Sequence, residues 1–111
     1  QIIDLGFDRI LTSGQGRTAY DGIPTLKRLI KHSENRIEIL VGGGVRDHNV
    51  SEICRETGCT QIHMGPLKDV PDYSTRHNAS VNFATSRLPK EGVYQIVDRH
   101  MVENVCRLVK L

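Results

Sequence analysis

The residues with the clearest capacity for ligand chemistry are three consecutive glycines, Gly42, Gly43 and Gly44. They follow an apolar segment directly and precede a segment with helical spacing. Glycine lets the backbone approach a ligand closely, and an array of N–H groups in such a turn attracts anions such as phosphate. Arg46, two residues later, could add a positive charge. A tight turn without a ligand accounts for the same residues equally well, so both interpretations stay open.

A second small polar group, Thr12, Ser13 and Gly14, closes another apolar segment. If both groups follow strands of one parallel sheet, they meet at the carboxyl edge, where the active sites of barrel enzymes are assembled. Ser13 has no base that the sequence can assign, so hydrogen bonding to an anionic ligand or helix capping is favoured over nucleophilic catalysis. The residues establish no enzymatic activity, and a protein without one is favoured.

Soft metal ligands form the third candidate group. His63 and Met64 end a third apolar segment, and imidazole and thioether both suit copper, with thioether favouring Cu(I). Neighbouring strand residues point to opposite faces, so the two side chains cannot readily reach one ion, and we expect Met64 in the core. Cys59 lies just after Gly58 in an expected loop, where an exposed thiol would be reactive. His63 and Cys59 are therefore the candidate metal ligands, and ordinary core and surface roles are the alternative.

Composition excludes several classes of protein. The 111 residues are 38% hydrophobic and 25% charged, which is typical of a soluble globular chain. A net charge of +2 with no Trp argues against nucleic-acid binding, and no apolar run approaches the about 20 residues of a membrane span. Three cysteines without a C-x-x-C pair indicate free thiols in a reducing compartment, so we expect a cytoplasmic protein, with the nucleus as a further location.

Strand-like and helix-like segments alternate along most of the chain. We expect strands at residues 7–12, 36–41 and 61–64, each followed by a glycine-containing turn. Such alternation is typical of βαβ units with a parallel sheet. Residues 66–92 show no periodicity and are expected to form a long loop.

Local signals mark the helices that connect these strands. Pro24 fits the first turn of the first helix, with Thr18 or Asp21 as its cap. Asn49 and a glutamate three residues later predict a capping box for the second helix, which Gly58 ends. The segment 1–5 reads as the last turn of a helix, and the final helix is expected to follow Asp98 as its cap, with an apolar stripe facing inward.

Three blocks of sequence resemble the C-terminal part of the CutC copper-homeostasis family. They are residues 5–14, which read LGFDRILTSG, residues 42–46 with Asn49, and the strand ending at His63. The tail 94–98, followed by a helix, is also similar to the end of that family. In contrast, residues 72–78 keep only Tyr73 and the Arg and Asn character of the stretch that family members usually carry there.

The resemblance implies a TIM-type (β/α)8 barrel, of which residues 1–111 would form strands 6 to 8 and their helices, as a fragment or a natural short form. It also implies a cytoplasmic copper-homeostasis protein that binds Cu(I) and forms homo-oligomers, with copper as its cofactor. The cysteines linked to copper in the family lie in a part that this chain does not contain, so the resemblance assigns no copper ligand to any cysteine of this chain. An enzyme or sensor for a small anionic ligand, and a structural fragment with neither activity, are the alternatives.

A sheet of only three strands has two open edges, which limits the stability that a chain of this length can reach alone. We expect the chain alone to be unstable or to persist through association with other chains.

Overall fold

Residues 1–74, 76–78, 80–81 and 92–109 are described by the computed structural model. The chain divides into two units, one made of Gln1–Gly65 with His100–Leu111 and one made of Pro66–Arg99. The first contains a parallel sheet with helices, and the second contains a two-stranded antiparallel sheet.

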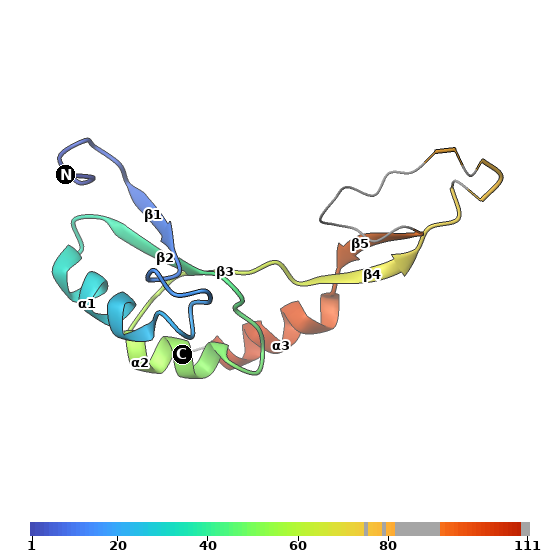
Figure 1. The fold of residues 1–111 in the computed structure, drawn as a ribbon. Coiled ribbons are helices and arrows are strands. Elements are labelled where there is room, and N and C mark those ends of the chain that lie inside the picture. Colours follow the sequence, from blue (N-terminus) through green and yellow to red (C-terminus); the bar gives the residue numbers. More distant parts are fainter. Residues whose placement is uncertain (75, 79, 82–91, 110–111) are drawn as a thin grey trace. The chain divides into compact units, whose positions relative to one another are not determined.

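Three parallel strands form the sheet of the first unit (Figure 1). They are β1 (Arg9–Thr12), β2 (Glu38–Gly42) and β3 (Ile62–His63), in the order β1-β2-β3. The predicted parallel sheet is confirmed, although β1 and β2 begin two residues later than expected. Because β2 lies in the centre, its buried side chains carry most of the packing between sheet and helices.

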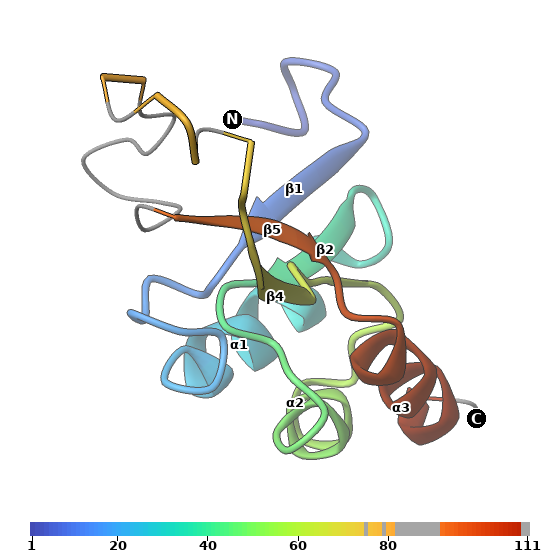
Figure 2. The ribbon, with the colours of Figure 1, turned by 90° about the vertical axis from the view of Figure 1, so that its right-hand side faces the viewer.

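Three helices lie on one side of this sheet (Figure 2). They are α1 (Ile23–Ser33), α2 (Val50–Thr57) and α3 (Arg99–Val109). Each contributes a side chain to the same core, namely Leu26, Ile53 and Val105, and Val41 of β2 lies among them. Burial of such side chains is the main stabilising contribution to a unit of this size. Within the described ranges, every helix is too short or too polar to span a bilayer.

The predicted helix boundaries are partly confirmed. Gly58 ends α2 in the left-handed conformation, with φ of 73°, and Pro24 lies in the first turn of α1. Gly22, rather than Thr18 or Asp21, occupies the N-cap position of α1, and those two side chains bond to each other instead. The expected caps are therefore wrong at α1, because the two residues stabilise the preceding loop.

The capping box predicted at α2 is also wrong. Asn49 does occupy the N-cap position, but its side chain makes no capping bond. Its Oδ1 accepts from the backbone N–H of Arg46 at 2.8 Å, and its Nδ2 donates to the carbonyl of Gly44 at 3.0 Å. The side chain holds the loop after β2 in place, so it is not available to the helix.

The second unit begins where a loop was predicted. Strand β4 (Leu67–Pro71) pairs antiparallel with β5 (Val93–Val97), with Leu67 opposite Val97. The expectation of a loop over 66–92 is thus wrong at its start, and residues 75, 79 and 82–91 lie outside the described residues. Both members of the Leu67–Val97 pair are exposed, at 48% and 60%, and no residue of either strand is fully buried, so no buried apolar face marks these strands.

Gly22 allows the loop after β1 to meet the start of α1. A Cβ on Gly22 would lie 1.8 Å from the carbonyl oxygen of Ser13, whereas a Cβ on Gly65 would meet nothing within 4 Å. We expect Gly22→Ala to lower the free energy of unfolding by about 3 kcal/mol or more, since backbone must move. Gly65→Ala, the matched control, should change it by less than about 1 kcal/mol. Urea unfolding followed by circular dichroism measures both, and equal midpoints would contradict this account.

Candidate functional site

The carboxyl ends of β1 and β2 bring the two predicted anion-binding groups together. Gly43 and Gly44 have φ of 106° and 67°, values that favour glycine. A Cβ on Gly43 would lie 3.1 Å from the Cβ of Ser13, and one on Gly44 would lie 3.3 Å from Cγ2 of Thr18. The glycines therefore serve a close approach between the loops that follow the two strands.

Hydroxyl groups in the loop after β1 are engaged within that loop. Thr12 Oγ1 accepts from the N–H of Gly14 at 3.0 Å. Ser13 Oγ donates to the carbonyl of Gly16 at 2.8 Å. These bonds fix the loop conformation, and a ligand that used the same hydroxyls would have to share them.

The backbone of the glycine loop is open to solvent at its tip. Gly43 and Gly44 are exposed, and the Gly43 carbonyl accepts from the N–H of Ala19 at 2.7 Å. Arg46 is half-buried, and its Nη1 donates to the neighbouring carbonyl of Val45 at 2.7 Å. The guanidinium is thus folded back on its own backbone.

A cavity of about 470 Å³ lies beside Gly44, and its lining includes Tyr20, His48 and Glu52. Hydrogen bonding to the Glu52 carboxylate raises the pKa of Tyr20. The same carboxylate repels an anion placed in this cavity.

His63 lies on the face of the sheet that the helices leave uncovered. Ile39 and Val41 of β2 point into the core, so Gly42 and the exposed Leu11 belong to the opposite face. A Cβ on Gly42 would lie 2.7 Å from Leu11 Cδ1 and 3.2 Å from the Cβ of His63. The absence of a side chain at Gly42 lets the imidazole and the leucine approach over the strand.

Cys59 does not lie beside His63. It follows α2, and its neighbour is the thiol of Cys54. It belongs to the core and is only 8% exposed. Its Sγ donates to Sγ of Cys54 at 3.8 Å, and all three cysteines of the chain are free thiols. Met64 also packs against the core, as expected, while Cys106 is exposed although the sequence placed it on the inward stripe of the last helix.

Burial gives the Cys54 thiol unusual acid–base behaviour. Desolvation, with the neighbouring Cys59 as a further cause, raises the pKa of Cys54 to about 11. At neutral pH this thiol is therefore protonated and a poor nucleophile, although a soft metal ion could displace its proton.

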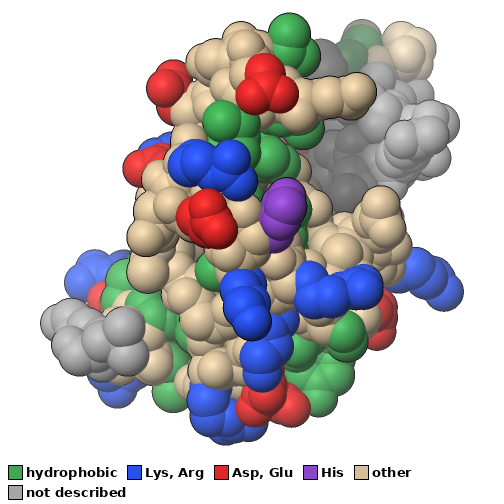
Figure 3. Space-filling model, turned by 90° about the vertical axis from the view of Figure 1, so that its left-hand side faces the viewer, with side chains coloured by type: hydrophobic (Ala, Val, Ile, Leu, Met, Phe, Trp, Pro, Cys, Tyr) green, Lys and Arg blue, Asp and Glu red, His purple; other side chains and the backbone are tan. Residues whose placement is uncertain are grey.

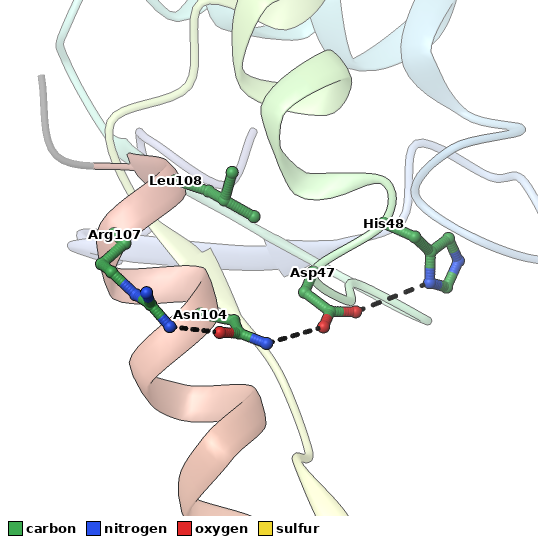
Figure 4. A pocket seen from close by; sticks show the side chains of 5 residues that line it. All are labelled: Asp47, His48, Asn104, Arg107 and Leu108. Atoms are coloured by element: carbon green, nitrogen blue, oxygen red, sulfur yellow. Dashed lines mark hydrogen bonds and ion pairs between the residues drawn. The ribbon is translucent and has the colours of Figure 1, made fainter.

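Sequence reasoning missed a polar cluster that joins the loop after β2 to α3 (Figure 4). Nδ2 of Asn104 donates to Asp47 at 3.3 Å, and Arg107 donates to Oδ1 of Asn104 at 2.6 Å. His48 Nδ1 lies 3.8 Å from the Asp47 carboxylate. With Leu108 these residues line a cavity of about 450 Å³. The partners are 57 positions apart, so no local signal could have revealed the contact.

Charged side chains of both signs lie on the face of the molecule that Figure 3 shows. In the view of Figure 3, acidic side chains lie among the basic ones, with hydrophobic side chains between them. Among the described residues, no three His, Cys, Asp or Glu side chains are grouped so that they could hold one metal ion.

The chain is similar in sequence to proteins of one kind, the CutC proteins. A CutC protein of Treponema denticola is 41% identical over 96 residues, covering 86% of this chain and 39% of the relative. The human copper homeostasis protein cutC homolog is 31% identical over 109 residues, covering 98% and 40%. This chain thus spans about two fifths of the length of these relatives.

A solved structure and a family model agree with those relatives. The crystal structure of a CutC protein from Streptococcus agalactiae matches 56% of this chain and 30% of its own, with 45% identity and a TM-score of 0.51. The model of the CutC family matches residues 1–67, which include β1, β2, β3 and the glycine loop. The chain belongs to the CutC family.

Proposed function

We propose that this protein serves copper homeostasis by binding Cu(I). The family match over residues 1–67 carries the proposal, and the name of the human relative gives the process. The chain itself supplies suitable donors, because three free thiols, together with thioether and imidazole groups, are the ligands that a soft cuprous ion prefers.

We also propose that the chain corresponds to the last three β/α units of a (β/α)8 barrel. Two observations support this: the strands are parallel, and the helices cover only one face of the sheet. In such a barrel the uncovered face, with Leu11 and His63, would line the interior. Association of copies of the chain and a cytoplasmic location belong to the same proposal, and a reducing compartment would keep the thiols free.

A small anionic ligand is the second candidate, with the glycine loop as its site. One observation favours it: the exposed Gly43 and Gly44 both have positive φ at the carboxyl edge of the sheet, beside Ser13 and Thr18 respectively. Neighbouring backbone N–H groups in such conformations form concave sites for anions.

Cuprous ion binding tests the first candidate. We expect stoichiometric binding when the chain is titrated anaerobically with Cu(I) against a chromophoric chelator, because thiolates retain this ion strongly. The control replaces Cys54, Cys59 and Cys106 together by Ser and should lose most of the affinity. If the unaltered chain holds Cu(I) no better than this control, the thiols do not serve copper binding.

Phosphate binding tests the second candidate. A Gly43→Val variant should lose binding of inorganic phosphate measured by calorimetry, because the side chain would fill the space beside Ser13 and strain a φ of 106°. Arg46→Gln, which leaves the backbone unchanged, should weaken phosphate binding by about tenfold. Unchanged affinity in both variants would exclude the loop as an anion site.

A further inference from the structure

We propose that Cys54 and Cys59 form a two-thiolate Cu(I) site at the C-terminal end of α2. This inference rests on the proposed function and names the residues that would carry it. The two sulfur atoms are 3.8 Å apart and free, and no disulfide joins them.

The distance between the sulfur atoms suits one bridging ion. Two metal–thiolate bonds of about 2.3 Å each, the length known for zinc, span at most about 4.6 Å, so one ion can contact both sulfur atoms at their separation of 3.8 Å. The open side of the ion could be approached by an additional ligand, such as the thiol of a molecule that delivers or removes copper.

The end of α2 holds the two thiols in this position. Gly58 takes a left-handed conformation, and its N–H donates to the carbonyl of Cys54 at 2.9 Å. The chain then folds back, and the N–H of Cys59 donates to Oγ1 of Thr57 at 3.2 Å. The Thr57 hydroxyl in turn donates to the carbonyl of Ile53 at 2.6 Å. Because these bonds already hold the two cysteines in position, metal binding costs little conformational entropy, which favours high affinity.

The number of ligands favours Cu(I) over Zn²⁺. Structural zinc sites use four protein ligands in a tetrahedron, and the described residues offer no group of three or more such side chains. A cuprous ion accepts low coordination numbers and is selected by thiolates. Two thiolates alone are thus a poor zinc site and an adequate cuprous site.

The two thiols open onto a groove at the surface of the first unit. Cys54 is half-buried and, with Cys59, lines a groove of about 410 Å³. Ile62 and Leu108 line the same groove and reduce the contact of the site with water. Arg55 also lines the groove, and its Nε donates to the carboxylate of Glu56 at 3.1 Å.

Binding exchanges protons for the metal. Two thiols and one cuprous ion give a dithiolate complex and two released protons, with no change in oxidation state. Because ligation of the thiols releases protons, the apparent affinity should rise with pH.

Single substitutions in the full chain identify the site. In anaerobic competition titrations, we expect Cys54→Ser and Cys59→Ser each to lower the Cu(I) affinity by about a hundredfold or more, since each removes one of two thiolates. The matched control is Cys106→Ser, which removes the exposed thiol of α3 and should leave the affinity and its pH dependence unchanged. Circular dichroism of each variant reports whether it is folded.

A second measurement keeps both Cys54 and Cys59 intact. X-ray absorption of the Cu(I)-loaded Cys106→Ser variant should show sulfur neighbours from two thiolates. Oxygen or nitrogen neighbours alone, or unchanged affinity in both pair variants, would overturn the site while leaving copper binding intact. Failure of the unaltered chain to bind Cu(I) would instead reject the proposed function together with this site.

Discussion

Close approach of backbone between the loops that follow β1 and β2 is the constraint on which the first unit depends. The N–H of Ala19 donates to the carbonyl of Gly43 at 2.7 Å and ties one loop to the other. A Cβ on Gly14 would lie 2.7 Å from Cγ of the buried Leu26, and one on Gly22 only 1.8 Å from a carbonyl oxygen. Because glycines allow these contacts, α1 can begin directly beneath the carboxyl edge of the sheet and deliver Leu26 to the core.

This constraint explains why the sequence alone is consistent with both a tight turn and an anion-binding site at the glycines. Gly42, the last residue of β2, and Gly43 in the loop after it have a structural reason to lack a side chain, since a Cβ there would contact Leu11 or Ser13 respectively. The same packing leaves the tip of the second loop exposed. Structural need and ligand access therefore coexist at one edge, and the sequence alone could not separate them.

Local and non-local features differ in how well the sequence predicted them. The parallel strands and the left-handed end of α2 at Gly58 follow from β-branched runs and a single glycine, which are local signals. Strand β4 escaped prediction because its partner β5 is distant in the chain and both strands are largely exposed. The capping box failed at Asn49 because its side chain bonds instead to the carbonyl of Gly44, five residues earlier in the same loop. For the candidate site, the residue types were predictable, but the pairing of Cys59 with Cys54 depended on how the chain turns after the helix.

The uncovered face of the sheet carries one cross-strand ion pair, between Arg9 of β1 and Glu38 of β2. Hydrogen bonds from Arg9 lower the pKa of the Glu38 carboxyl, so the pair stays fully charged at neutral pH. Each charge on these two residues is matched by its neighbour, while Leu11 adds apolar surface to the same face. A partner surface that covered these strands would therefore meet a charge-balanced layer, and it would not need to bring a counter-ion of its own.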